Sequence, residues 1–287
     1  MKSMIINMPQ KVSIHIPAFN AERTINECID SLFNQTVPFD EIIVVNDFSS
    51  DKTLEILKKY KTIKIINNKM NMGLSYSRNQ AIKNSRNEII ASIDSDVILE
   101  DQWLEKMLFH LNKEGILMCG GKLEEKLTNN KFNLWRAKYY SQNWGNQDKL
   151  SPNFLFGCNT LQKKSIWQEI GGYNENFKTN GEDIDYSNKI KNLNKGNLFY
   201  CANAKCFHLQ NDNLESLSNR VWRYHAFGYK IKEPSFKRLI KLSIKQFKFM
   251  INRTLLNLIK FNLNNIYISA FIFIKFIELE YKYFKKK

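Results

Sequence analysis

Short apolar runs and helical patterns alternate four times along the first 120 residues, and this alternation constrains the fold more than any other feature. The run Glu41–Val45 is apolar without alternation, which is typical of a strand buried on both faces. The pattern predicts strands at 12–16, 41–45, 63–66, 88–93 and 116–120, with helices at 21–33, 53–60, 74–84 and 102–111. Such a chain is expected to form a doubly wound α/β sheet with helices on both faces.

The charge of the chain is unevenly distributed. Residues 1–219 hold 27 Lys and Arg against 25 Asp and Glu, a net charge of +2. Residues 220–287 hold 16 against 3, a net charge of +13. Hydrophobic residues make up 43% of the chain, which excludes global disorder. The charge asymmetry predicts a nearly neutral body, 1–219, and a basic tail, 220–287.

Cysteine usage and the N-terminus bear on the compartment. The five cysteines form no CxxC pair and no paired framework, which favours a reducing compartment. The first nine residues lack the apolar stretch of a signal peptide, and no run approaches the roughly 18 apolar residues of a membrane span. We therefore expect a cytoplasmic protein.

Acidic and amide side chains follow three of the predicted strands. In open α/β sheets, ligands bind beyond the carboxyl ends of the strands. Asp94 and Asp96 leave the strand 88–93 two residues apart, and carboxylate oxygens suit Mg²⁺ or Mn²⁺ that share a substrate diphosphate. The alternative is a turn whose aspartates cap the next helix. No GxGxxG follows the first strand and no P-loop is present, which disfavours an ordinary dinucleotide fold and a P-loop NTPase.

Seven short segments occur together in a distinctive order. They are Ile16-Pro-Ala-Phe-Asn-Ala-Glu22, Val44-Val-Asn-Asp-Phe-Ser-Ser-Asp-Lys-Thr53, Asn71-Met-Gly-Leu-Ser-Tyr-Ser-Arg-Asn79, Ile93-Asp-Ser-Asp-Val97, Gly157-Cys-Asn with Gly171-Gly-Tyr-Asn-Glu-Asn-Phe177, and Gly181-Glu-Asp-Ile-Asp185. In this order the chain resembles the inverting glycosyltransferases of family 2, which have the GT-A fold. The resemblance covers about residues 11–210. It implies a nucleotide-sugar half, about 11–123, and an acceptor half, about 124–219.

The resemblance also implies roles for single residues on the donor side. Asp47 would hydrogen-bond the base, Arg78 would lie near the base or phosphate, and Asp94 would face the ribose. Asp96 would ligate Mn²⁺ or Mg²⁺ under the diphosphate. The base and ribose pocket would be lined by Pro17, Phe19, Asn20 and Glu22. Phe48 stands where the family usually has glycine, so the resemblance does not carry the local turn geometry or the base preference over to this chain. Asp51 is expected to form the turn and cap the next helix.

A second acidic group, at Glu182 and Asp183, precedes a helical stretch from 186 to 193. Acidic residues there can simply face the helix macrodipole. Transfer with inversion also needs a carboxylate that takes the acceptor hydroxyl's proton, and the resemblance gives that role to Asp183, with Glu182 shaping its surroundings. His208 is either a structural residue or, as the resemblance implies, a ligand of the metal or diphosphate.

The aromatic residues of 130–156 have two interpretations. Trp135 and Tyr139 lie at helical spacing, which favours a place in the core. Trp144 lies beside Gly145 and is the better candidate for stacking on an acceptor sugar.

The basic tail carries a helical apolar ridge at Phe236, Ile240, Ile244, Phe247, Ile251, Leu255 and Leu258, with lysines to one side. Residues 266–274 are strongly apolar but too few to span a bilayer. The tail, 236–287, could lie on an anionic membrane surface. It could instead pack on the body or form a homo-oligomer. Nucleic acid is disfavoured because no recognised module is present.

The sequence as a whole predicts a metal-dependent glycosyltransferase that uses a nucleotide-diphosphate sugar and a saccharide or lipid-linked acceptor, placed peripherally at the inner face of the cell membrane. Two alternatives stay open. A sugar nucleotidyltransferase shares the acidic sheet edge but normally has a Gly-rich, Arg- or Lys-bearing loop after the first strand. A membrane-binding module with a degenerate catalytic fold would have no need of Asp94, Asp96 and Asp183 together.

Overall fold

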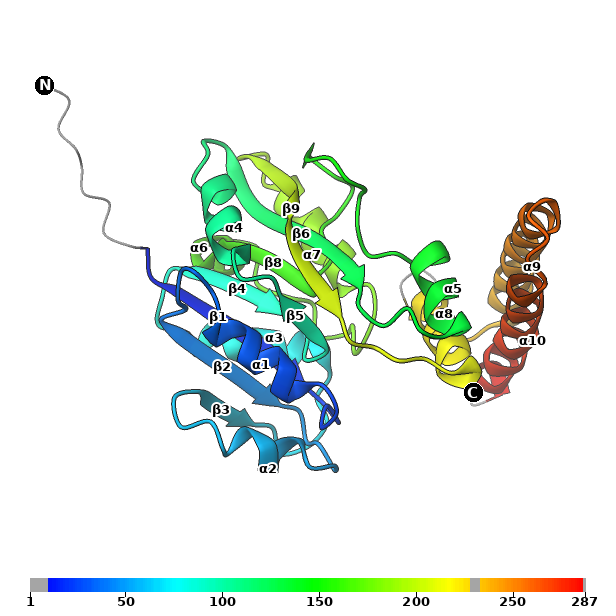
Figure 1. Cartoon of the computed structure of the whole chain (residues 1–287), viewed down its shortest axis with the longest axis horizontal. Helices are drawn as coiled ribbons and strands as arrows, with labels where there is room; N and C mark the ends of the chain where they lie inside the picture. The colour runs from blue at the N-terminus through cyan, green and yellow to red at the C-terminus, as the bar shows by residue number, and fades with distance from the viewer. Residues whose placement is uncertain (1–9, 228–232, 286–287) are drawn as a thin grey trace, which may run out of the picture. The chain divides into compact units, whose positions relative to one another are not determined.

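A computed structural model describes residues 10–227 and 233–285, so the N-terminal segment, residues 228–232 and the last two lysines of the tail lie outside the described residues (Figure 1). The chain forms two compact units. Among the described residues, unit 1 comprises 10–123, 143–178 and 183–207. Unit 2 comprises 124–142, 179–182, 208–227 and 233–285.

Unit 1 is built on a mixed sheet whose first half is parallel. Its order is β3-β2-β1-β4, with every neighbouring pair parallel. These strands are β1 (Val12–Ala18), β2 (Glu41–Asn46), β3 (Lys64–Asn67) and β4 (Ile89–Ile93). All four lie where the apolar runs predicted them. Parallel pairing follows because a helix separates each strand from the next and returns the chain to the same end of the sheet.

The second half of the sheet breaks the simple alternation. β8 (Asn159–Lys163) pairs antiparallel with both β4 and β6 (Ile116–Glu125). The order continues through β9 (Asn197–His208) to β5 (Val97–Leu99), and β7 (Lys149–Leu150) pairs with β9. β5 was not predicted, because three residues directly after the Asp94-Ser-Asp96 turn carry too little periodicity to identify a strand.

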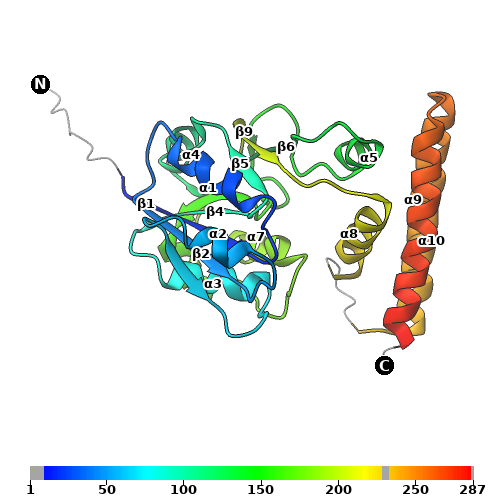
Figure 2. The same cartoon turned by 60° about the horizontal axis from the view of Figure 1, so that its bottom comes forward.

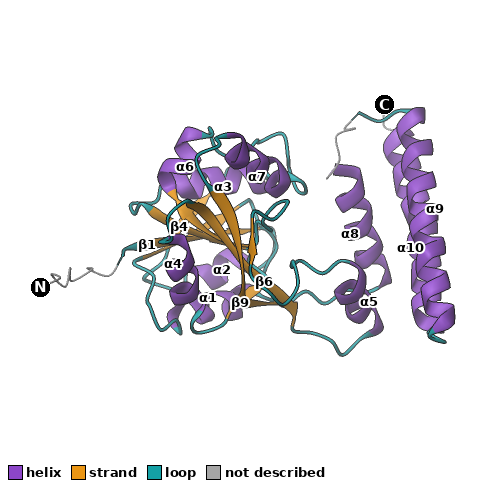
Figure 3. Ribbon diagram, turned by 90° about the horizontal axis from the view of Figure 1, so that it is seen from above, coloured by secondary structure: helices purple, strands orange, loops and turns teal. Residues whose placement is uncertain are grey.

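Helices cover both faces of the sheet, as the sequence predicted (Figure 3). One face carries α1 (Ile25–Phe33), α2 (Thr53–Leu57) and α4 (Trp103–Leu111), and the other carries α3 (Leu74–Lys83), α6 (Lys164–Glu169) and α7 (Glu182–Asn192). The strands are apolar on both sides for this reason. In β2, Ile42 and Val44 belong to the cluster under α1, whereas Ile43 and Val45 pack with Ala81 of α3.

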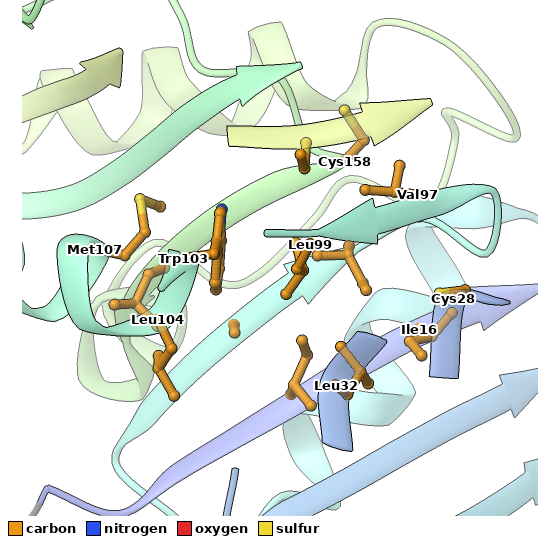
Figure 4. Close-up of a cluster of buried hydrophobic side chains, with 14 of the residues drawn as sticks. Ile16, Cys28, Leu32, Val97, Leu99, Trp103, Leu104, Met107 and Cys158 are labelled. Carbon is orange, nitrogen blue, oxygen red and sulfur yellow. The ribbon is translucent and has the colours of Figure 1, made fainter. Parts of the chain in front are cut away.

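The main core lies under α1 and α4 (Figure 4). Cys28 and Leu32 of α1 face Ile16 of β1, and Trp103 lies fully buried at the start of α4. The Trp103 indole N–H donates to Asn159 Oδ1 at 2.7 Å, which satisfies the one polar atom of the ring. All five cysteines are buried thiols, in line with the predicted absence of a disulfide framework.

Unit 2 is helical and includes the basic tail. It holds α5 (Lys131–Tyr139), α8 (Leu214–Phe227), α9 (Phe236–Ile259) and α10 (Leu263–Lys285), and α9 and α10 run side by side (Figure 2). α10 also contacts α5 and α8. Trp135 of α5 is fully buried among them, which confirms its predicted place in a core. The predicted boundary at residue 219 lies inside α8.

The tail packs in part through polar pairs. Arg238 of α9 is fully buried and its Nε lies 2.5 Å from Glu280 Oε1 of α10, while the Trp222 indole N–H donates to Glu280 Oε2 at 3.0 Å. Within the apolar stretch 266–274, Ile268 and Ile272 are buried in unit 2, so that side of α10 belongs to the core. Among the described helices, none is long and apolar enough to cross a membrane.

Arg238→Met should lower the free energy of unfolding by about 3–5 kcal/mol, because it removes the cation from a buried ion pair and leaves the Glu280 carboxylate behind. Lys282→Met is the matched control, since Lys282 pairs with Glu278 on the exposed surface of α10, the helix that carries Glu280. Such a pair contributes about 1 kcal/mol or less. Chemical denaturation of the full chain measures both. Equal effects of the two substitutions would contradict this account of tail packing.

Candidate functional site

The register of the parallel strands brings the predicted donor residues to one edge of the sheet. Ala18 pairs with Asn46, and His15 pairs with Ser92. Asp94, two residues beyond Ser92, is therefore level with the end of β1. The Asp47 N–H donates to Ala18 O at 2.8 Å, which fixes the first residue after β2 against the same edge. Pro17 lies within β1 and is buried.

Two loops at this edge are tied together by side chains that the sequence assigned to the donor pocket. Asn20 Oδ1 accepts from the Ser50 N–H at 2.8 Å. Glu22 Oε2 accepts from the Lys52 N–H at 3.0 Å. Asp51 Oδ1 accepts from the N–H of Thr53, the first residue of α2, at 3.0 Å, so Asp51 forms the predicted turn, but the residue at the cap position is Lys52 rather than Asp51. Burial by itself would raise the pKa of Asp51, but the hydrogen bonds from Thr53 and Glu22 together lower it.

Asp47 fixes the loop that precedes α3. Its two carboxylate oxygens accept backbone N–H groups from Met72 and Gly73, each at 2.8 Å, and the Asn68 side chain at 2.7 Å. Gly73 has φ +93°, and a Cβ there would come within 2.9 Å of Lys178 O, so glycine is required. α3 begins at the next residue. The base contact predicted for Asp47 stays a prediction, and this buried carboxylate already uses three of its about four acceptor positions.

Arg78, one turn into α3, is the buried cation at the centre of the edge. Its guanidinium is 1% exposed, and Nη2 lies 2.8 Å from Asp94 Oδ1. A Cβ on Gly157 would come within 2.6 Å of Arg78 Nη1, so the guanidinium fills the space that this glycine leaves. Burial, and then the Arg78 charge, lower the pKa of His15 to about 3. His15 is therefore a neutral, buried structural residue of β1.

α7 begins at Glu182, four residues before the predicted helix start at 186, so the predicted base Asp183 lies in its first turn. Asp183 is half-buried, and its Oδ1 accepts the Ile184 N–H at 2.8 Å. Burial raises the pKa of Asp183, and this effect outweighs the opposing charge of Arg78. A carboxylate with a raised pKa is a better proton acceptor than an ordinary exposed aspartate. Its neighbour Glu182 is the first residue of α7 and is buried.

Two exposed phenylalanines stand at the ends of β1 and β2. Phe19 is 51% exposed and Phe48 is 58% exposed. Phe48 has φ +62°, a left-handed conformation that favours glycine, which is the residue the resemblance leads one to expect at this position. The glycine-type turn is therefore kept, with a strained aromatic residue in it.

His208 belongs to a buried ionic cluster in unit 2 that the sequence did not reveal. His208 Nδ1 lies 3.1 Å from Glu125 Oε2, and Glu125 also pairs with Arg136, which in turn pairs with Asp212. Burial alone would raise the pKa of Glu125, but hydrogen bonds from His208 and Arg136 lower it to about 2. Glu125 and Arg136 lie outside the motifs that carry the family resemblance, and no local sequence pattern marks them.

Trp144 takes part in the packing of unit 1. Its indole N–H donates to Phe154 O at 2.8 Å, and its ring contacts those of Phe154 and Phe156. Trp144 is half-buried, and the Lys149 ammonium lies over its ring, 4.9 Å from the centroid. Its predicted contact with an acceptor stays a prediction.

The acidic pair at the end of β4 fits a divalent cation whose coordination shell is completed by substrate oxygens. Within residues 10–227 and 233–285, no group of three His, Cys, Asp or Glu side chains forms a ready-made metal cage. Asp94 and Asp96 are half-buried carboxylates that follow β4, so their oxygens are hard ligands partly open to solvent. Mg²⁺ and Mn²⁺ are typically held by one or two such carboxylates together with substrate phosphates.

A family model described as glycosyl transferase family 2 matches residues 13–171, more than half of the chain. The chain belongs to glycosyl transferase family 2. It is 31% identical over 188 residues to an uncharacterised glycosyltransferase of Haemophilus influenzae, covering 63% of this chain and 58% of that one. It is 28% identical over 250 residues to the chondroitin synthase of Escherichia coli, covering 83% of this chain and 34% of that one. The chain thus spans less than two thirds of each relative.

The fold of this family 2 member is also similar to that of solved structures. TarS 1–349 of S. aureus superposes with a TM-score of 0.60 at 16% identity, covering 97% of this chain and 92% of that one. The mannosyltransferase PcManGT of Pyrobaculum calidifontis, solved with GDP-Man and Mn²⁺, superposes with a TM-score of 0.65 at 14% identity, covering 94% and 86%. These likenesses confirm the predicted GT-A fold with its C-terminal helical extension.

Phe48→Gly should raise the melting temperature, because it relieves a left-handed backbone that costs an L-residue about 1 kcal/mol. A gain of this size corresponds to about 2–4 °C. Phe33→Gly is the matched control, since Phe33 is an equally exposed phenylalanine that lies in α1 and there glycine should destabilise by about 1 kcal/mol. Calorimetry measures both shifts, and a lower melting temperature for Phe48→Gly would contradict the strain.

Proposed function

We propose that this chain transfers a sugar from a nucleotide-diphosphate sugar to a hydroxyl of a saccharide or lipid-linked acceptor, with inversion at the anomeric carbon. One observation carries the proposal: the buried Arg78 cation pairs with Asp94 at the edge of the sheet, and its charge also lowers the pKa of Asp183. Burial of Asp183 has the larger effect, so that pKa is raised. One charge thus links a donor-side carboxylate to a candidate base.

The donor side is supported by the chemistry of the sheet edge and by solved structures with a similar fold. PcManGT was solved with GDP-Man and Mn²⁺, and TarS with UDP. We assign Asp96 to the metal and Asp94 to the ribose. His208 pairs with Glu125 in unit 2, and its role as a ligand of the metal or diphosphate stays a prediction. Bound Mn²⁺ or Mg²⁺ would supply positive charge for the leaving diphosphate. The base and ribose pocket is assigned to Pro17, Phe19, Asn20, Glu22, Asp47 and Arg78.

The acceptor side is assigned to Asp183, Glu182 and Trp144. An acceptor hydroxyl becomes a sufficient nucleophile when a carboxylate takes its proton as the oxygen attacks the anomeric carbon. Attack from the face opposite the leaving diphosphate inverts that carbon, and no covalent sugar–enzyme step is needed. Asp183 therefore has to be ionised when the acceptor binds, and its raised pKa makes the proton transfer more favourable.

Two other functions are weaker. A sugar nucleotidyltransferase needs a cationic loop after the first strand, whereas Asn20 there is tied to Ser50 and carries no charge. A degenerate binding module would have no reason to keep Asp183 partly desolvated, which costs stability. The acceptors would lie at a membrane if they are lipid-linked, and we therefore propose a cytoplasmic enzyme placed peripherally at the inner face of the cell membrane.

Asp96→Ala should abolish Mn²⁺-dependent binding of a nucleotide-diphosphate sugar, because the diphosphate charge loses the cation that compensates it. Asp101→Ala is the matched control, since Asp101 is an exposed aspartate a few residues further along the chain. Titration calorimetry with UDP- and GDP-sugars, with Mn²⁺ and with a chelator, gives the affinities. Metal-dependent binding that survives Asp96→Ala would remove Asp96 from the metal site.

Asp183→Asn should leave donor affinity nearly unchanged while transfer falls by about 10²–10⁴, the usual contribution of a positioned general base. The folded-state pKa of Asp183 is raised, so its charge opposes folding above that pKa, and the neutral amide should not lower the melting temperature at neutral pH. Asp185→Asn, two residues along the same helix, serves as the control. A transfer rate little changed by Asp183→Asn would shift the base to another residue.

The same group sets the acid limb of the pH profile. Transfer requires ionised Asp183, so kcat/KM should fall as pH decreases through its pKa. That fall should be centred above the ordinary aspartate value of about 3.9, and it should disappear from the residual activity of Asp183→Asn. A profile of the variant that keeps the same acid limb would assign the limb to a different group.

A further inference from the structure

α9 has its apolar side exposed and polar residues on its buried side. The predicted ridge from Phe236 to Leu258 is exposed along its whole length, with exposed fractions between 39% and 64%. The fully or nearly fully buried residues of the same helix are Arg238, Leu242, Gln246 and Asn257. Asn257 donates to the Tyr139 hydroxyl at 2.6 Å, and Arg238 pairs with Glu280. This polarity is the reverse of a helix that packs on a core by its apolar stripe.

The turn between α9 and α10 continues the apolar surface. Ile259, Phe261 and Leu263 are 74% to 92% exposed, more than any residue of the ridge. Leu255, Leu256 and Leu258 next to the turn are also more than half exposed. A contiguous apolar surface of this kind is rare on a protein that has no partner for it.

The charges around this surface have a single sign. From residue 234 to residue 277 the sequence contains eight Lys and Arg and no Asp or Glu. Lys237, Lys241 and Lys248 are exposed, and each directly follows a residue of the ridge. The surface therefore offers a strip of apolar side chains with ammonium groups alongside it.

We propose that the α9–α10 hairpin docks on an anionic lipid bilayer, with the ridge and the turn among the acyl chains and the flanking lysines at the headgroup phosphates. Interfacial helices bury an apolar face at the headgroup boundary in this way, and anionic lipid attracts the basic residues beside it. The inference deepens the peripheral location proposed above by naming the surface and the lipid chemistry. It does not depend on any donor-site residue.

A second copy of the chain fits this surface less well. A two-fold dimer through the ridge would bring the same lysine strip from each copy to one interface. With no acidic residue between 234 and 277, like charges would meet there uncompensated. An anionic membrane supplies the opposite charge and the apolar environment together.

The experiment is flotation of the full-length protein with vesicles of phosphatidylcholine alone and of phosphatidylcholine with phosphatidylglycerol. The protein should float with the anionic vesicles and much less at high salt, because the attraction is screened within a Debye length. Leu255→Ser with Phe261→Ser should abolish flotation. Phe109→Ser is the matched control, since Phe109 is an exposed phenylalanine on α4 of unit 1.

A second pair of variants separates charge from apolar contact. Lys241→Gln with Lys248→Gln should weaken binding to anionic vesicles by about fivefold for each lysine. The control is Lys58→Gln with Lys59→Gln, exposed lysines in unit 1. Melting temperatures of all variants check that each is folded, which exposed positions should allow.

Several outcomes would overturn the proposal. Wild-type protein that ignores anionic vesicles, or hairpin variants that float as well as the controls, would remove the membrane surface. If the wild-type protein sediments as an oligomer without lipid, and Leu255→Ser with Phe261→Ser dissociates that oligomer, the ridge is an interface with a second copy of the chain. Sugar transfer to a soluble acceptor should be unchanged in the hairpin variants. The two proposals can therefore fail separately. If Asp183→Asn keeps its transfer rate, the proposed function fails whether or not the protein floats. If the hairpin variants still float, the membrane proposal fails whether or not transfer is intact.

Discussion

The buried guanidinium of Arg78 is the interaction on which the site depends. A charge that is 1% exposed is costly unless it is paired, and its partner Asp94 lies 2.8 Å away. Arg78 reaches that place because Asp47 fixes the loop before α3 and Gly73 allows the sharp entry into the helix. Asp47, at the end of β2, therefore determines the position of Arg78, and Arg78 in turn holds Asp94 at the end of β4.

The same guanidinium explains why the site tolerates several acids close together. Asp183 has a raised pKa because it loses water, and Arg78 limits that rise without cancelling it. The negative charge of Asp94 raises the pKa of Asp183 further, since two carboxylates near each other disfavour ionisation. Enzymes that need a base adjust its pKa by this balance of burial and charge, and here the balance involves one cation that is fixed by the fold.

The sequence predicted the parallel strands and their helices well, because buried parallel strands are continuous apolar runs that periodicity detects. It did not predict β5 or the Glu125–Arg136–His208 cluster, because three-residue strands and long-range ionic pairs have no local pattern. It identified the ridge on α9 but could not say which side of the helix faces the core. That choice depends on partners far along the chain, since Glu280 pairs with Arg238 and the Tyr139 hydroxyl accepts from Asn257.

Phe48 and the ridge of α9 are both unfavourable for the protein on its own, the first in its backbone conformation and the second in its exposed apolar surface. A glycine would relax the turn at Phe48, and polar residues would be more soluble at Phe261. Conflicts between local preference and observed structure concentrate where a protein contacts something other than itself. The first lies at the edge that carries the donor-side carboxylates and the second on the basic hairpin. We therefore interpret both as surfaces that a ligand covers: a nucleotide at the one and lipid at the other.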